Sequence, residues 1–320
     1  MHNQRLPIIP LAVLKTHKVN EISDNRFKAA ARLLQSLWRE DKGLPIGSYR
    51  TAKGKRRKLG SRLDASSAKA GSNFITPEIA KLAQREVIYR EIGAMINEER
   101  FWSNLLSSQP LCLNLFGGLK LDMEKANLFF RQLLPDYVAQ VNGIFFEHSP
   151  GRANPAFTDD NTAFDVFVTC TTPDGECAFI AIEVKYSETM SETPAALRPR
   201  YDELSSNAGV FKDHAVIALR GAPLQQLWRE HMLSRAMLTN GSYSQGRFVV
   251  IHPSQNTCCV SAINAYKEHL TSSDPTESGF QSVTLENCLE ALILIGDDAA
   301  AKALHCRYID FERVERAIFG

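Results

Sequence analysis

The sequence has little that would mark a membrane protein or a strongly charged one. Its 320 residues carry 37 Lys and Arg against 36 Asp and Glu, so the formal net charge is only +1 and no overall field favours a polyanionic partner. No apolar run approaches the length of a membrane span; Pro7–Leu14 is apolar but short and is interrupted by Pro10. We therefore expect a cytoplasmic protein without a membrane partner.

Several common site signatures are also missing. The seven cysteines are an odd number without a Cys-x-x-Cys spacing, which favours free thiols in a reducing compartment over disulfides or a zinc site. The sequence contains no Gly-x-x-x-x-Gly-Lys-[Ser/Thr] loop, no Gly-x-Ser-x-Gly elbow and no His-Glu-x-x-His pair. These absences argue against P-loop, serine-hydrolase and zinc-protease chemistry.

The most informative segment is Thr162–Glu188, in which charged residues stand inside two runs of strand-like composition. Ala163–Thr172 and Cys177–Ser187 are rich in β-branched and aromatic residues, as strands are. Between them, Pro173-Asp174-Gly175 has the composition of a three-residue hairpin loop, with glycine in the left-handed position. The pattern predicts an antiparallel β-hairpin.

The length of the loop sets which residues face one another. If Thr172 faces Glu176, counting back along both strands places Asp165 opposite Glu183, and Lys185 then lies on the same face. A four-residue loop would shift the register by one and separate the two carboxylates. Three apolar neighbours are expected to point the other way, into a core: Phe164, Ile182 and Val184.

Two opposed carboxylates are destabilising unless a cation neutralises them. Mg²⁺, with Mn²⁺ as an alternative, prefers one or two carboxylates together with waters and phosphate oxygens, so we expect Asp165 and Glu183 to bind it, with the Val184 carbonyl as a further ligand. Lys185 would position or help to deprotonate a metal-activated water, or offset negative charge in the transition state. The alternative is a solvated sheet face on which Lys185 pairs with a carboxylate.

The series Asp165…Glu183-Val184-Lys185 on consecutive strands resembles the core motif of the PD-(D/E)xK nuclease superfamily. The usual Pro-Asp dipeptide is missing, because Phe164 precedes the aspartate. The longer context is similar to bacterial PD-(D/E)xK nuclease-like proteins, from about Thr76 to the C-terminus. The segments that carry this similarity are Leu105–Leu119, Phe146–Arg152, Thr162–Val168 and Ile180–Glu188.

The resemblance implies an α/β or α+β fold, with a restriction-endonuclease-like mixed β-sheet core flanked by helices. It also implies Mg²⁺-dependent hydrolysis of phosphodiester bonds, with DNA as the expected substrate. Members often add a glutamate from a helix that precedes the strands. Fold analogy alone does not establish activity, so a nucleic-acid-binding or regulatory module with little cleavage activity stays open, as does a scaffold whose carboxylates only pair with Lys or Arg.

Two residues are candidates for the additional glutamate. Thr76-Pro77-Glu78 has the composition of a helix start, and Glu86 lies near the apolar stripe of that helix. Glu147 is closer in sequence to the strands. The alternative for Glu86 is an ion pair with Arg90 at i,i+4.

The chain is expected to divide into an N-terminal extension, residues 1–75, and a nuclease-like domain, residues 76–320. The extension has a short helix over Asn25–Glu40 and a basic segment, Ser48–Arg62, which is suited to follow a phosphate backbone or else is a solvated disordered loop. The later elements are predicted as strand His214–Leu219, helix Pro223–Thr239, strand Arg247–His252, loop Thr271–Ser282, and helices Leu285–Ile295 and Ala299–Phe319.

Overall fold

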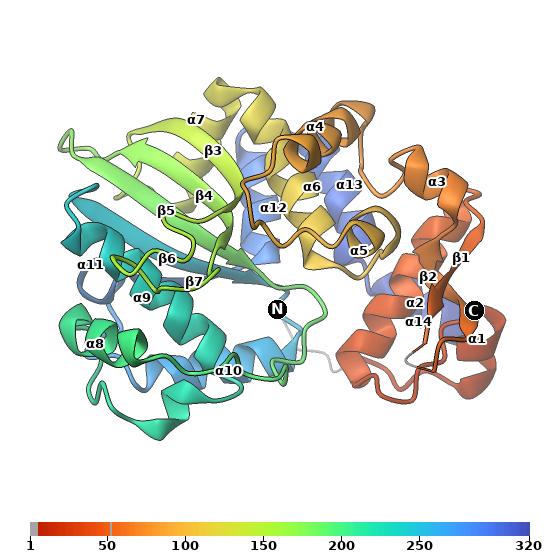
Figure 1. The fold of residues 1–320 in the computed structure, drawn as a ribbon. Coiled ribbons are helices and arrows are strands. Elements are labelled where there is room, and N and C mark those ends of the chain that lie inside the picture. The colour runs from red at the N-terminus through yellow and green to blue at the C-terminus, as the bar shows by residue number, and fades with distance from the viewer. Residues whose placement is uncertain (1–5, 52) are drawn as a thin grey trace.

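A computed structural model describes residues 6–51 and 53–320 of the chain (Figure 1). Its centre is a five-stranded sheet with the order β3-β4-β5-β6-β7. β3, β4 and β5 pair antiparallel, whereas β5, β6 and β7 pair parallel, so the sheet is mixed. The strands are β3 Gln140–His148, β4 Phe164–Thr171, β5 Cys177–Val184, β6 Gln245–His252 and β7 Phe280–Thr284.

The β4–β5 hairpin has the register that the sequence predicts. Val166 faces Ile182, and Thr171 faces Cys177 at the other end of the ladder. The Thr172 amide donates to the Glu176 carbonyl (3.0 Å), and Gly175 closes the loop at a φ of 83°, a conformation in which glycine has no Cβ penalty. The ladder ends with Val166 and Ile182, one position before Asp165 and Glu183.

Helices cover both faces of the sheet (Figure 1). On one face α6 (Ser108–Leu121), α7 (Met123–Leu133) and α12 (Leu285–Leu294) pack on apolar residues that include Ile182 and Val184. On the other face lie α8 (Pro199–Ala208), α9 (Gln225–Thr239) and α10 (Thr257–Lys267). The mixed sheet with helices on both sides confirms the expected fold class.

One predicted orientation is wrong. Phe164 packs with Phe167 and Phe248 in the core under α9, not in the core that contains Ile182 and Val184. Phe164 and Phe167 are three positions apart, so β4 does not keep strict alternation in its first residues. Here β4 pairs with β3 but not yet with β5, and the β3 residue between the two paired positions, Glu147, has a φ of 51°, so the regular pleat is interrupted.

The N-terminal part supplies α1 (Leu11–Thr16), α2 (Arg26–Asp41), strands β1 (Ile46–Arg50) and β2 (Arg56–Leu63), and α3 (Ala65–Lys69). The predicted helix over Asn25–Glu40 is confirmed as α2, which the Asn25 side chain caps by accepting from the Lys28 amide. The basic segment is not a disordered loop: it forms the antiparallel β1–β2 hairpin. α4 (Pro77–Ile88) begins behind the predicted Thr76 cap and is followed by α5 (Glu98–Ser103).

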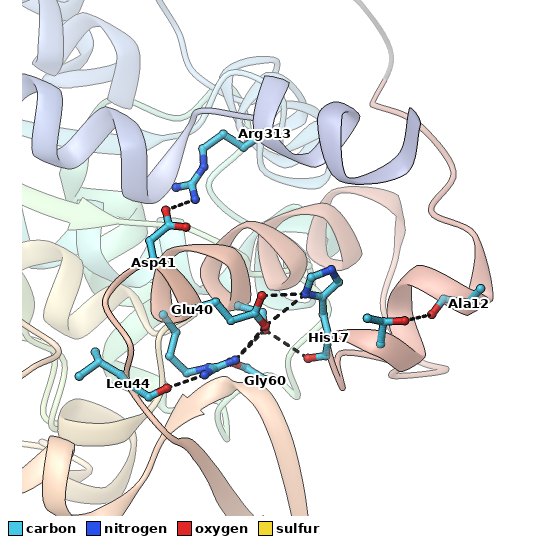
Figure 2. Close-up of polar contacts among 10 residues, drawn as sticks. Ala12, His17, Glu40, Asp41, Leu44, Gly60 and Arg313 are labelled. Carbon is cyan, nitrogen blue, oxygen red and sulfur yellow. Dashed lines mark hydrogen bonds and ion pairs between the residues drawn. The ribbon is translucent and has the colours of Figure 1, made fainter. Parts of the chain in front are cut away.

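Polar contacts hold the hairpin and the C-terminal helices on α2 (Figure 2). Arg39 donates to the carbonyls of Gly60 and Leu44, which fixes the path of the chain on both sides of the hairpin. Glu40 contacts His17, and Asp41 pairs with Arg313 of α14 (Glu312–Phe319). α2 also packs on α13 (Asp298–Tyr308), so helices from the N-terminal and C-terminal parts of the chain share one core.

Some of the other predicted helices and strands differ from those in the structure. His214–Leu219 is not a strand, because the Asp213 side chain accepts from the Ala215 amide in a turn and a 3-10 helix, Ile217–Arg220, follows. The predicted loop Thr271–Ser282 contains α11 (Pro275–Ser278) and the start of β7, and β3 was not predicted. The predicted helices at Pro223–Thr239 and Leu285–Ile295 are confirmed as α9 and α12, and the strand at Arg247–His252 is confirmed as β6. The last predicted helix is interrupted, giving α13 and α14.

None of the helices that the structure describes has the length and apolar character needed to cross a membrane. All seven cysteines are free thiols.

A buried arginine joins the first and last parts of the chain. Arg307 of α13 is fully buried and lies 4.3 Å from the ring centroid of Trp38 on α2. It donates to the backbone carbonyl of Asn73 (2.6 Å) and to the Gln35 side chain (3.4 Å). Burial lowers the pKa of Arg307, yet no carboxylate pairs with it among the described residues. Carbonyl and amide oxygens therefore satisfy this guanidinium.

Arg307→Met should preserve packing volume but leave the Asn73 side-chain oxygen without a donor and its carbonyl with only the Asn114 amide. We expect the free energy of unfolding in urea to fall by about 3 kcal/mol. Lys302→Met, on the exposed side of the same helix, is the matched control and should change it by less than about 0.5 kcal/mol. Equal effects of the two substitutions would contradict this account of the buried arginine.

Candidate active site

The predicted site residues gather at the end of the sheet where β4 begins and β5 ends. Asp165 is the second residue of β4, and its Oδ2 accepts a hydrogen bond from the Val184 amide, 2.9 Å away, at the last residue of β5. The carboxylate is thus fixed by the backbone of the Glu183-Val184-Lys185 segment. The hairpin brings these residues to one end of the sheet, but the predicted common face is wrong: Asp165 lies on the α6 side, whereas Glu183 and Lys185 contact α9.

Glu183 and Lys185 form a buried polar cluster with α9. Each is 5% exposed, and Lys185 Nζ lies 2.6 Å from Glu183 Oε1. Gln226 of α9 joins both: its Oε1 accepts from Lys185 (2.8 Å) and its Nε2 donates to Glu183 (2.8 Å). Burial disfavours the charge on Lys185, but Glu183 and further carboxylates raise its pKa above the ordinary value. Lys185 is therefore held as an ammonium.

A second acid in this cluster was not predicted from the sequence. Glu230, one turn after Gln226 on α9, is 3% exposed, and its Oε1 accepts from the Gln226 amide at 2.9 Å. Its Oε2 has no hydrogen-bond partner in the described part of the chain. Burial and the nearby Glu183 raise the pKa of Glu230 well above its usual value. The Gln226–Glu230 spacing of four was a usable signal, because it places both side chains on one helix face.

Asp165 lines a narrow cavity on the α6 side of the sheet end. The cavity encloses only about 20 Å³ and brings together Asp165, Glu147 and Glu86 with Gln109 and Cys112. Burial raises the pKa of Asp165 well above its usual range, and Glu183 and then Glu147 raise it further. Asp165 thus lies among the predicted acids, close enough for Glu183 to be the strongest neighbouring charge.

Glu147 occupies an unusual backbone position at the end of β3. Its φ is 51°, in the left-handed region, and the Arg152 guanidinium donates to its carbonyl at 2.7 Å. Glu91 anchors the same segment by accepting from the Ser149 amide (3.1 Å) and from Arg152 (3.3 Å). Burial and then Glu183 raise the pKa of the Glu147 carboxyl to about 7.

Glu86 borders the cavity from α4 but already has a cationic partner. Lys120 Nζ of α6 lies 2.6 Å from Glu86 Oε1. The predicted alternative, a Glu86–Arg90 ion pair, is wrong: α4 ends at Ile88, so Arg90 is beyond its last turn and pairs with Glu98 instead (2.9 Å).

The acids divide between two sides of the sheet end. Asp165, Glu147 and Glu86 share the narrow cavity beside α6, whereas Glu183 and Lys185 contact α9. Within residues 6–51 and 53–320, one group of three ligand atoms lies within 4.8 Å of one another, and it is His305, Cys306 and Asp310 near the end of α13. The predicted acids therefore do not form a three-carboxylate cage.

This donor set nevertheless fits a hard divalent cation. Asp165 and Glu183 offer carboxylate oxygens. Burial and then the charge of Glu183 raise the pKa of Asp165, and a bound cation would offset both effects. Mg²⁺ is commonly held by one or two carboxylates, with water and phosphate oxygens completing its shell, so a cage of three is not required.

The fold and this acidic hairpin define a mixed α/β nuclease core of the restriction-endonuclease-like type. A family model described as the PD-(D/E)XK nuclease superfamily matches residues 22–310, and the chain belongs to that superfamily. The match confirms the resemblance read from the sequence and extends further towards the N-terminus than Thr76. No curated protein and no solved structure matches the chain significantly. Membership supports a nuclease-like function, with nucleic acid as the substrate class and a divalent metal as the usual cofactor.

The raised pKa of Glu147 predicts a pH-dependent stability in EDTA. Its carboxyl titrates near about 4.3 in an unfolded chain but about 7 in the folded protein. Between these values the folded state binds the extra proton, so stability is full at low pH and declines as pH rises through 7. Unfolding in urea should show that Glu147→Gln gains about 2 kcal/mol relative to wild type between pH 5 and pH 8.

Glu290→Gln, at an exposed position on α12, is the control for this comparison, and its stability should follow the wild-type pH curve. A Glu147→Gln protein that keeps the wild-type pH dependence would contradict the buried, charge-crowded environment of Glu147.

Proposed function

We propose that the protein is a divalent-metal-dependent nuclease that hydrolyses phosphodiester bonds in DNA. One observation carries the proposal: in a chain of the PD-(D/E)XK superfamily, the β4–β5 hairpin brings Asp165, Glu183 and Lys185 to the same end of the sheet, with Asp165 bound to the Val184 amide and Lys185 to Glu183. The composition of the site supports phosphoryl chemistry, because hard oxygen donors and a fixed cation both serve to stabilise charge on phosphate oxygens.

Asp165, Glu183 and the Val184 carbonyl would hold Mg²⁺, or Mn²⁺ in its place. When bound, the metal supplies Lewis-acid activation of water and charge neutralisation at the phosphate. Asp165 is oriented for this role by the Val184 amide, and Glu183 by Gln226.

Lys185 acts as a cation and not as the base that removes a proton from water. It donates to Glu183 and Gln226, and its pKa is raised, so its role is to orient water and to offset negative charge on the phosphate. Gln226 fixes this arrangement, since its carbonyl oxygen faces the ammonium and its NH₂ group faces the carboxylate.

Glu147 and Glu86 are proposed to assist the metal-binding residues, and the contacts of Glu147 suit this role better than those of Glu86. Glu147 shares the cavity with Asp165 and has a pKa of about 7, which suits proton exchange near neutral pH. Glu86 would have to leave Lys120 before it could serve a metal. Glu147 is therefore the stronger of the two candidates.

In this proposal residues 76–320 are the nuclease-like domain and residues 1–75 an extension that packs on it through α2. The cytoplasm is the proposed location.

A second candidate function is a nucleic-acid-binding module with little cleavage. It is favoured by the narrowness of the cavity beside Asp165, about 20 Å³, which must open before a phosphate can enter.

Purified protein should cleave labelled DNA in Mg²⁺ or Mn²⁺ and not in EDTA. Asp165→Asn, Glu183→Gln and Lys185→Met should each lower the rate at least about 100-fold, because each removes a charge that the reaction requires. Asp174→Asn, which removes an exposed acid from the loop of the same hairpin, should retain the wild-type rate.

Parallel reactions with RNA decide the substrate. If the protein cleaves RNA in preference to DNA and requires the same three residues, RNA replaces DNA as the proposed substrate. Absence of products from either nucleic acid, with binding unchanged in Asp165→Asn and Lys185→Met, would favour the binding module.

Metal binding can be measured without cleavage. Because a ligand of the folded state stabilises it, saturating Mg²⁺ should raise the melting temperature of wild-type protein by about 3 °C or more. Asp165→Asn should abolish the shift, and Asp174→Asn should leave it intact. An equal shift in wild type and Asp165→Asn would place the cation elsewhere.

A further inference from the structure

The β1–β2 hairpin concentrates positive charge in a nearly neutral protein. Residues 46–63 contain seven Lys and Arg and no Asp or Glu, whereas the whole chain has a net charge of +1. Arg57 pairs with Glu21 (3.0 Å). Arg56 and Lys58 are exposed and form no ion pair within the part of the chain that the structure describes. A basic two-stranded ribbon of this kind provides charge for a polyanion.

A cavity of about 720 Å³ lies between this hairpin, α3 and α5, the short helix that follows α4. Three cationic side chains line it: Arg56 and Lys58 from β2, and Lys69 from α3. The indole of Trp102 on α5 forms part of its wall. The volume lies in the range of sites that hold small organic ligands.

Trp102 is fixed in this wall by other aromatic rings. It meets Phe101 edge-on at 5.0 Å and 89°, and Phe74 at 5.5 Å and 78°. Trp102 remains partly exposed, whereas Trp38 and Trp228 are 7% and 0% exposed. A rigid aromatic side chain at a cavity wall is a platform on which a planar base can stack.

The acids of the same cavity are already engaged. Asp64 caps α3 by accepting from the Ser66 and Ser67 amides. Glu98 pairs with Arg90 (2.9 Å), and Glu99 lies 3.6 Å from Arg62. The unpaired charge that remains around the cavity is therefore positive.

Helix α5 connects this cavity to the candidate active site. Phe101 lines the narrow cavity that contains Asp165, and its neighbour Trp102 lines the hairpin cavity. One short helix thus forms a wall of both. In Figure 1 α5 lies between the central helix α6 and the β1–β2 hairpin. A strand held in the hairpin cavity is one helix away from the carboxylates.

We propose that the hairpin cavity binds single-stranded nucleic acid, with one unstacked base against Trp102 and the adjoining phosphates on Arg56, Lys58 and Lys69. A single strand is specified because a base inside a duplex is stacked and cannot enter a cavity. This binding site rests on the proposed nuclease function in one respect only, the choice of nucleic acid as the ligand. Binding at this place does not depend on Asp165, Glu183 or a metal.

The test is fluorescence polarisation in EDTA with a labelled oligo-dT, the matching oligo-U, and a DNA duplex. Arg56→Gln, Lys58→Gln and Lys69→Gln combined should weaken single-strand binding at least about 10-fold and reduce the salt slope by about 2. The matched control changes three exposed cations elsewhere, Lys212→Gln, Lys302→Gln and Arg316→Gln, and should stay within about twofold of wild type.

Trp102 is tested separately. Trp102→Ala should weaken single-strand binding about 5- to 100-fold, and Trp102→Phe, which preserves a stacking ring and the contacts with Phe74 and Phe101, by much less. Oligo-dT should quench the tryptophan fluorescence of wild-type protein, because the other two tryptophans are buried, and this quenching should disappear in Trp102→Phe. Trp102→Phe also serves if Trp102→Ala fails to fold.

Equal losses in the hairpin and control triples, quenching that persists in Trp102→Phe, or duplex binding as tight as single-strand binding would each overturn the proposal. Preference for oligo-dT or for oligo-U would support it and would tell DNA from RNA. Binding with this pattern, in a protein that cleaves nothing in Mg²⁺ or Mn²⁺, would overturn the proposed nuclease activity and leave the hairpin site standing.

Discussion

The site depends on the repulsion between two carboxylates that the hairpin brings to one end of the sheet. Asp165 and Glu183 lie near each other at the end of a hairpin whose register the three-residue loop Pro173–Gly175 sets, and burial makes the proximity of their charges costly. The surrounding structure offsets that cost in three ways. The Val184 amide donates a hydrogen bond to Asp165. Glu183 accepts hydrogen bonds from Lys185 and Gln226. The raised pKa of Asp165 favours binding of a proton or a cation at its carboxylate.

Much of this arrangement could be read from the sequence, because its causes are local. The loop residues fix the register, and the register fixes which side chains oppose each other, so the central hairpin was predicted correctly. The same local logic identified α2 through the helical spacing of its apolar residues and α4 through Thr76, whose side chain caps it. The mixed sheet and the superfamily followed from these elements together with the resemblance.

What the sequence did not show depends on partners far along the chain. Gln226 and Glu230 belong to a helix some 40 residues beyond the motif; their spacing of four puts them on one helix face but does not show that this face meets Glu183. β7 is a short segment that is a strand because it pairs with β6. Glu86 pairs with Lys120 and not with Arg90, because α4 ends before Arg90. Tertiary contacts override local pattern at such positions.

The packing of α2 against α13 and α14 also determines when the fold can be completed during synthesis of the chain. Residues 26–41 bury apolar side chains against helices that begin at residue 298, so that surface stays open to solvent until the last part of the described chain has been made. Closure of such a non-local contact is a late event during synthesis. The Arg307 contacts with Gln35 and Asn73 then join the two ends of the described chain, and a chain interrupted before residue 298 would leave the apolar face of α2 exposed to solvent.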